Sequence, residues 1–354
     1  STCKNTEVYY TKRNDMPENG DRKLVSFPWN HVHFVGVGGA GMSGLALILL
    51  EAGVSVSGSD QACTKGYRRV ERCGGQVHTG HSAQHLPSTV DAVVYSSAVD
   101  ADNPELVEGK RRQIETYLRG AFLGRLSEFF GTVIGVAGSH GKTTTTAMLA
   151  HILKKTGWHP AYLIGGEVPS WPAPASAGKG RILVTEVDES DGTQALVHST
   201  YGVVLNVEDD HCWRHGGESA LLECFQKFAD NAREVVTGQD DATTRELFQN
   251  HPNATYVPAE SSRVETEMPM PGEHNRRNAA IASTVAERIG VSRDMCREAL
   301  KDFPGVSRRM TVHFEDPGGH VKLIEDYAHH PTEIRTTLEA ARWLEPRRIM
   351  AVFQ

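Results

Sequence analysis

The sequence predicts an α/β protein with three successive domains: a Rossmann-like N-terminal domain, a central P-loop ATPase-like domain and an incomplete C-terminal α/β domain. Two glycine-rich turns support this prediction, because each lies between an apolar, β-branched run and a helical pattern. The third observation is a Pro-Gly break at Pro304, after which strand patterns begin again. We expect the boundaries to divide the chain into residues 1–30, 31–128, 129–304 and 305–354.

The first domain is expected from strand patterns that alternate with a helical pattern. Residues 31–37, 54–57 and 91–95 have strand patterns, and residues 42–52 have a helical one. This alternation is typical of a parallel sheet with helices on its faces. Residues 1–30 are polar and lack the apolar core of a signal peptide, so we expect a flexible extension there.

The rest of the chain repeats this alternation. The stretch 169–180 is rich in Pro, Ala, Ser and Gly, which predicts an exposed loop inside the central domain. Strands are expected at 132–136, 181–187, 201–207, 310–314 and 321–325, and an apolar run at 349–353 would end the last sheet. Helices are expected from Lys142, around 218–231, and at 275–289, 293–303 and 331–343.

Composition limits the classes of function. The chain has 354 residues, 39% of them hydrophobic and 23% charged, which is typical of a globular protein. A formal net charge of −7 gives no general attraction to nucleic acid or to an anionic membrane. The longest apolar run, residues 42–50, is too short to cross a bilayer. Six scattered cysteines form no zinc or disulfide pattern, so we expect a reducing, cytoplasmic setting.

The first glycine-rich turn has the pattern G-x-G-x-x-G at Gly36, Gly38 and Gly41. Glycines let backbone N–H groups approach a diphosphate, and the following helix N-terminus attracts its charge. Asp60 ends the next strand pattern, where a ribose-binding acid would fall. We therefore expect a nucleotide diphosphate at this turn; the alternative is close strand–helix packing without a ligand. NAD and a UDP-sugar carry the same pyrophosphate, so the turn does not distinguish them.

The second turn, residues 138–143 with the sequence GSHGKT, ends like a phosphate-binding loop. The strict pattern requires a glycine where Val136 stands, but backbone amides and Lys142 still supply donors and a cation. Thr143 supplies a hydroxyl for Mg²⁺. We therefore expect ATP at this turn. The alternative, a lysine-capped helix entry, leaves the β-branched run 143–146 unexplained.

Acidic residues follow the strand pattern at 181–187. Glu186, Asp188, Glu189 and Asp191 would be costly to hold together without a cation, and we expect Glu186 to contact Mg²⁺. His211 follows the next strand pattern, near the edge of the sheet where open α/β folds bind their ligands. A second ion is expected near this histidine, and a capping or surface role is the alternative.

Together these segments resemble the Mur ligase family. The resemblance rests on residues 33–44, 138–146, 186–191 and 326–334, the last with the sequence DYAHHPTEI, which resembles the members that add alanine. It implies ATP-dependent ligation of L-alanine to the carboxylate of UDP-N-acetylmuramate through an acyl phosphate, in peptidoglycan precursor synthesis, with two Mg²⁺ ions. The chain departs from the family at Trp213 and His215, where an aspartate and a tyrosine are usual.

The resemblance also implies roles for individual residues. The residues implied for the UDP-sugar are Gly36, Gly38, Gly39, Gly41, Met42, Ser43, Asp60, His81, Ser96 and Ser97. Those implied for ATP are Gly138, Ser139, His140, Gly141, Lys142, Thr143, Thr144, His274, Asn275, Asn278, Arg309 and Asp326. The implied metal contacts are Thr143, Glu186 and His211. Catalytic roles are implied for Lys142, His140, Glu186, His211, Arg309 and His329.

Other functions stay open at this point. A dinucleotide-dependent oxidoreductase would use the first turn but not the second. A ligase for another amino acid or a recycled tripeptide, or a folylpolyglutamate-type ligase, would share the ATP site, and a binding-only protein would keep both nucleotides without ligation. The segment after Pro304 is shorter than an ordinary α/β domain, so we expect the 354-residue chain to bind both nucleotides but to form little amide.

Overall fold

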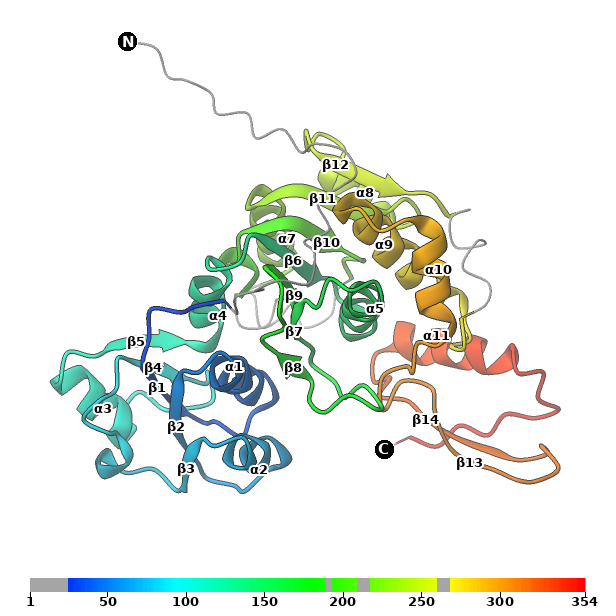
Figure 1. Ribbon diagram of the computed structural model, residues 1–354. Helices are drawn as coiled ribbons and strands as arrows, with labels where there is room; N and C mark the ends of the chain where they lie inside the picture. The colour runs from blue at the N-terminus through cyan, green and yellow to red at the C-terminus, as the bar shows by residue number, and fades with distance from the viewer. Residues whose placement is uncertain (1–24, 189–192, 209–216, 260–267, 354) are drawn as a thin grey trace, which may run out of the picture.

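The computed structural model describes residues 25–188, 193–208, 217–259 and 268–353. Figure 1 shows two sheet-containing parts, one in blue and cyan and one in green and yellow, followed by an orange and red segment. Within the described residues, every helix is too short or too polar to span a lipid bilayer. The predicted α/β class and its Rossmann-like first domain are confirmed.

The first part is a parallel five-stranded sheet with strand order β3-β2-β1-β4-β5. β1 is buried at every position, as expected for a central strand covered by helices on both faces. The strand order reverses between β1 and β4, and the first glycine-rich turn follows β1 at this point. The strands are β1 (His31–Val35), β2 (Ser55–Asp60), β3 (Gln76–Thr79), β4 (Ala92–Tyr95) and β5 (Glu115–Leu118). The helices are α1 (Ala40–Glu51), α2 (Lys65–Arg72), η1 (Ala83–His85), α3 (Pro104–Arg111) and α4 (Arg119–Ser127).

The central part is a seven-stranded sheet with strand order β12-β11-β10-β6-β9-β7-β8, in which only the β7–β8 pair is antiparallel among the described strands. The strands are β6 (Thr132–Ala137), β7 (Ala161–Leu163), β8 (Ala175–Ser176), β9 (Ile182–Glu186), β10 (Ser199–Val204), β11 (Ala232–Gly238) and β12 (Ala254–Val257). The helices are α5 (Lys142–Lys155), η2 (Thr193–Ala195), α7 (Glu218–Asp230), α8 (Ala242–Phe248), α9 (Glu273–Ile289) and α10 (Arg293–Lys301). Because the strands β6, β9, β10, β11 and β12 are parallel, their carboxyl ends meet at one edge.

The last segment is a hairpin followed by one helix. β13 (Thr311–Glu315) pairs with β14 (Lys322–Glu325), and α11 (Pro331–Arg342) follows. α11 packs against the start of α9, with the Arg276 guanidinium 4.4 Å from the centre of the Trp343 ring. The apolar run 349–353 forms no strand, and Val352 is 96% exposed, so the expected sheet end is wrong for these residues.

Two expectations about exposed segments need correction. Residues 25–30 are not a flexible extension, because Val25 and Trp29 are buried and Trp29 packs 4.8 Å from the Phe122 ring. The stretch 169–180 is not simply an exposed loop, because it contains β8 and the buried Ala175. Small residues let this stretch pack closely against α1: a Cβ on Gly44 would lie 3.4 Å from the Ala175 side chain. The Pro, Ala, Ser and Gly composition of the stretch did not reveal this packing.

Candidate functional site

The second glycine-rich turn lies between β6 and α5, as predicted. Gly138 and Gly141 have φ angles of 138° and 85°, which side chains with a Cβ rarely adopt. Gly141 is the N-cap of α5, so the first amides of this helix face the carboxyl edge of the central sheet. Lys142 folds back over the turn and donates a 2.6 Å hydrogen bond to the Gly138 carbonyl oxygen. The turn thus combines helix amides and a cation at one place.

The end of β10 holds this turn in position. The Asn206 side chain accepts from the His140 amide at 2.8 Å and donates to the His140 carbonyl oxygen at 3.1 Å. Ser139 donates its amide to the Asn206 carbonyl oxygen at 3.2 Å, and its hydroxyl accepts from the Glu208 amide at 2.9 Å. These bonds fix the shape of the turn formed by residues 138–143, which we call the phosphate loop.

A pair of oxygen donors for a hard cation lies beside the loop. The Thr143 hydroxyl is 3.1 Å from one Glu186 carboxylate oxygen, and the other oxygen accepts from the Gly165 amide. Burial raises the pKa of Glu186, although the Lys142 charge and these hydrogen bonds oppose the increase. A partly buried carboxylate beside a hydroxyl fits Mg²⁺, which prefers oxygen ligands. The other predicted ligand, His211, lies outside the described residues.

A cavity of about 260 Å³ opens from the phosphate loop toward α9, α11 and the ends of β11 and β12. It brings together residues that lie far apart in the sequence. Asn278 reaches the loop itself, because a Cβ on Gly141 would lie 3.1 Å from its carboxamide atoms. The predicted ATP residues that line the cavity are His140, Gly141, Thr144, His274, Asn275, Asn278, Arg309 and Asp326.

Two predicted residues at the start of α9 have distinct environments. The side-chain Nδ2 of Asn275 donates to the Pro271 carbonyl oxygen at 2.7 Å, which holds the chain just before the helix. His274 is largely enclosed, and burial lowers its pKa, so its imidazole is held in the neutral form. The cavity wall is therefore uncharged at His274 itself, whereas Asp240, Arg277 and Arg309 are among the charged side chains that line the cavity.

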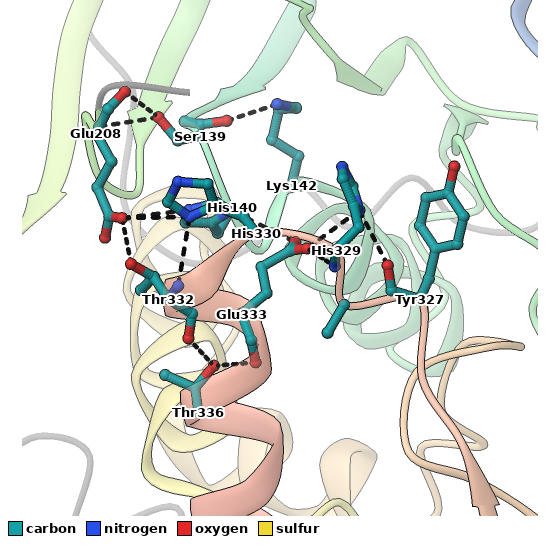
Figure 2. Close-up of polar contacts among 12 residues, drawn as sticks. Ser139, His140, Lys142, Glu208, Tyr327, His329, His330, Thr332, Glu333 and Thr336 are labelled. Atoms are coloured by element: carbon teal, nitrogen blue, oxygen red, sulfur yellow. Dashed lines mark hydrogen bonds and ion pairs between the residues drawn. The ribbon is translucent and has the colours of Figure 1, made fainter. Parts of the chain in front are cut away.

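The start of α11 closes over the phosphate loop, as Figure 2 shows. His140 lies between two carboxylates, with Nε2 3.4 Å from Glu208 and Nδ1 3.4 Å from Glu333. Burial alone would raise the pKa of Glu333, but the His140 contact, the Arg309 charge and the His329 amide lower it to about 2. Glu333 is therefore ionised at neutral pH.

The other residues predicted between Pro304 and α11 lie near Glu333. Arg309 lies 3.4 Å from Glu333 and 3.8 Å from Asp326, and Asp326 accepts from the Met310 amide at 2.9 Å. His329 donates its amide to Glu333 at 3.1 Å, but its ring is exposed and does not line the cavity. The structure thus places Arg309 and Asp326 in the lining of the cavity and the His329 ring outside it.

The first glycine-rich turn follows β1, and hydrogen bonds to β2 and to the start of α2 hold it in place. Gly36 has φ 85° and donates to the Ser59 carbonyl oxygen at 2.8 Å. Asp60 accepts from the Gly38 amide at 2.8 Å, and Thr64 donates to the Gly38 carbonyl oxygen at 2.8 Å. Asp60 therefore supports the turn through its carboxylate, and its contact with a ribose stays a prediction.

The other residues predicted for the UDP-sugar divide into two groups. Gly39 is exposed at the N-cap of α1, and Ser96 and Ser97 follow β4 at the point where the strand order reverses. His81 follows β3, with Nδ1 2.9 Å from the hydroxyl of Ser59 in β2. Met42 and Ser43 are buried in α1, and their contact with the UDP-sugar stays a prediction.

Several residues of these sites were missed by sequence reasoning. Arg119 brings a guanidinium nitrogen to 2.9 Å from where a Cβ on Gly41 would lie, which adds a cation beside the first turn. Glu208, Thr332 and Glu333 also line the cavity beside the second turn. The sequence signal for Glu333 was its place three residues after His330, the N-cap of α11, where a carboxylate often accepts from amides at the helix start.

Three family profiles match the chain in succession. The profile described as "Mur ligase family, catalytic domain" matches residues 31–130, "Mur ligase middle domain" matches 136–259, and "Mur ligase, glutamate ligase domain" matches 308–354. They match in the order of the sheets in the fold, and the second covers both the phosphate loop and Glu186.

Curated relatives and solved structures agree with these profiles. The UDP-N-acetylmuramate–L-alanine ligase of Anaeromyxobacter sp. (strain Fw109-5) is 37% identical over 91% of this chain and 76% of its own length. That of Gloeobacter violaceus is 39% identical over 91% and 74%. The solved UDP-N-acetylmuramate–alanine ligase of Thermotoga maritima has a TM-score of 0.75 at 29% identity, over 89% of this chain and 78% of that one. The chain belongs to the Mur ligase family.

Proposed function

We propose that this protein ligates L-alanine to the carboxylate of UDP-N-acetylmuramate, with ATP as the energy source, in peptidoglycan precursor synthesis. The observation that carries the proposal is the phosphate loop with its Thr143–Glu186 oxygen pair, which opens into a cavity covered by the start of α11. The names of the relatives at 37% and 39% identity agree with this assignment. We infer that the reaction takes place in the cytoplasm, in line with the scattered cysteines.

ATP fits the central domain through two kinds of contact. The amides at the start of α5 and the Lys142 ammonium group would bind the phosphates, as in other phosphate loops. The cavity near Asn278 and His274 would take the nucleoside, since carboxamide and neutral imidazole groups can pair with an uncharged base. Arg309 would reach a phosphate oxygen from the segment that follows Pro304.

Thr143 and Glu186 would hold a Mg²⁺ ion at the phosphates. The family resemblance is the support for a second ion near His211, which lies outside the described residues. When bound, Mg²⁺ neutralises the charge that develops on the transferred phosphoryl group. The hydrogen bond from Gly165 and the neighbouring Lys142 fix the Glu186 carboxylate in advance. Fixed donors of this kind require no rearrangement during the reaction.

The reaction would then proceed in two steps. A carboxylate oxygen of UDP-N-acetylmuramate attacks the γ-phosphorus of ATP, ADP leaves, and an acyl phosphate forms. The alanine amine attacks the acyl carbon, phosphate leaves, and the amine loses a proton. His140, fixed between Glu208 and Glu333, would position the carboxylate beside Lys142. His329, whose ring lies outside the cavity, would meet the substrates only after a movement of its segment.

The first domain would bind the UDP-sugar. The diphosphate fits the Gly36–Gly38 turn, where the start of α1 and the Arg119 guanidinium provide positive charge. Ser96 and His81 lie at the same edge of the sheet and would contact the sugar or the base.

A product assay tests the proposal. The protein is incubated with ATP, Mg²⁺, UDP-N-acetylmuramate and an equimolar mixture of L-alanine, glycine, L-serine and a stem tripeptide, and products are identified by mass spectrometry. We expect a single new product whose mass corresponds to one added alanine, with matching ADP release. A product that carries the tripeptide and no alanine product would contradict the assignment.

A further inference from the structure

Three consecutive residues after β7 contact three different parts of the molecule. The Gly165 amide donates to Glu186 at the candidate magnesium site. A Cβ on Gly166 would lie 2.9 Å from both Thr143 and Val306, so this residue fills the gap between the phosphate loop and the start of the last segment. The Glu167 carbonyl oxygen accepts from the Ser307 amide at 2.8 Å, and Figure 1 shows the green segment after β7 meeting the orange one there.

The Glu167 side chain points in a third direction, to α2 of the first domain. Arg69 donates two parallel hydrogen bonds to its two carboxylate oxygens, at 2.9 Å and 3.0 Å. This paired geometry gives the strongest and most directional form of the ion pair. The Arg69 side chain is only 11% exposed, so solvent screens it little. Lys65 also lies 3.2 Å from Glu167, but it is 69% exposed and contributes less.

The helix that carries Arg69 is itself attached to the first glycine-rich turn. Its N-cap residue, Thr64, donates to the Gly38 carbonyl oxygen at 2.8 Å. Gly66 is so close to the turn that a Cβ there would lie 2.6 Å from the same oxygen. A rigid helix therefore connects the turn to Arg69, and the ion pair connects Arg69 to the loop at the magnesium site.

We propose that Glu167 is a positioning residue that couples the UDP-sugar turn to the ATP site through its ion pair with Arg69. This inference rests on the proposed function. Glu167 does not line the ATP cavity, so it acts through Gly165 and the backbone around it. A shift of α2 when the diphosphate binds would move Glu167 and, with it, the amide that holds Glu186. Binding of one nucleotide would thereby favour the arrangement that binds the other.

The test measures coupling between the two ligands by calorimetry. The dissociation constant of UDP-N-acetylmuramate is determined with and without Mg²⁺ and adenylyl imidodiphosphate, a non-hydrolysable ATP analogue. In the parent we expect the analogue to tighten UDP-sugar binding by about fivefold or more, the usual range for coupled sites. Glu167→Gln should reduce this factor to less than about twofold, because loss of a fixed charged pair removes most of a modest coupling energy. Each ligand alone should still bind Glu167→Gln.

A double-mutant cycle distinguishes this coupling from a general loss of structure. Arg69→Gln should reduce the coupling factor as Glu167→Gln does, and the double variant should be no worse than either single variant. Lys65→Gln, on the same helix and beside the same carboxylate, is the matched control and should keep the parent's factor within about twofold. Thermal unfolding of each variant checks that it is folded.

The outcomes separate the two proposals. Three results would each overturn the role of Glu167 and leave the proposed function intact. They are a parent that binds both ligands without coupling, a Glu167→Gln variant that couples as the parent does, and single-variant losses of coupling energy that add up in the double variant. A parent that does not bind UDP-N-acetylmuramate at all would overturn the proposed function, and this inference with it.

Discussion

Replacing Glu333 by glutamine should weaken the attachment of α11 to the phosphate loop at neutral pH. The Glu333 carboxylate faces the His140 ring, the Arg309 guanidinium and the His329 amide and ring, and Asp326 is the other carboxylate near Arg309. These groups favour the ionised form strongly enough to lower the pKa of Glu333 from 4.5 to about 2, although burial opposes them. Glutamine keeps the shape of the side chain but not its charge.

The size of the effect follows from this pKa. The difference between 4.5 and about 2, at about 1.4 kcal/mol per pH unit, corresponds to about 3 kcal/mol. Because the pKa is lower in the folded protein, this stability is present above pH 4.5 and is lost as the pH falls through about 2. At pH 3 the contribution should be about half of its value at pH 7.

Hydrogen exchange of the α11 amides, followed by mass spectrometry, measures this attachment. At pH 7 we expect exchange in Glu333→Gln to be faster by up to about a hundredfold, the equivalent of about 3 kcal/mol, and at pH 3 the difference should shrink. Glu315→Gln is the matched control, since its ion pair with Lys322 is 47% exposed at the carboxylate and should matter less than about fivefold. Equal protection of α11 in Glu333→Gln and the parent at pH 7, or a difference that does not decrease at pH 3, would refute the reasoning.

Three further predictions concern other parts of the molecule. Lys142→Ala should raise the dissociation constant for ATP by about tenfold or more, because it removes the cation of the phosphate loop, and parent-like binding in calorimetry would contradict the assignment. Glu186→Gln should increase the Mg²⁺ concentration needed for tight nucleotide binding while metal-free binding stays unchanged, and an unchanged Mg²⁺ dependence would argue against it as a ligand. Trp29→Ala should lower the free energy of unfolding by about 3 kcal/mol in urea titrations, whereas an unchanged midpoint would mean that residues 25–30 add nothing to the packing.

The sequence was most informative where local chemistry determines the structure. Both glycine-rich turns lie between a buried strand and a helix, as predicted. They could be predicted because the φ angles that need glycine and the alternation of strand and helix are properties of short segments. The two strands and the helix predicted between residues 310 and 343 are also present, with ends that differ by a residue or two, but the sheet end expected at 349–353 is not. The gathering of Asn278, Arg309 and Asp326 around one cavity was expected from the family resemblance and not from spacing alone.

Features that depend on distant partners were beyond sequence reasoning. The burial of Trp29 requires the aromatic rings of α4 and the residues after it, and the fit of β8 requires the small residues of α1. Asp60 stands at the predicted place, but its hydrogen bond from the Gly38 amide of the turn was not expected. Glu333 and His140 meet only because α11 folds back onto the central sheet.

The central claim is that the first domain binds a UDP-sugar beside an ATP site, and it is tested most directly by calorimetric titration of the protein with UDP-N-acetylmuramate and, separately, with NAD. Both ligands carry a pyrophosphate that the first turn could accept, so any difference in their affinity comes from the rest of the site. We predict that UDP-N-acetylmuramate binds and that NAD binds at least about tenfold more weakly, which is a difference of about 1.4 kcal/mol. Binding of NAD at micromolar strength, with no heat from UDP-N-acetylmuramate, would contradict the account.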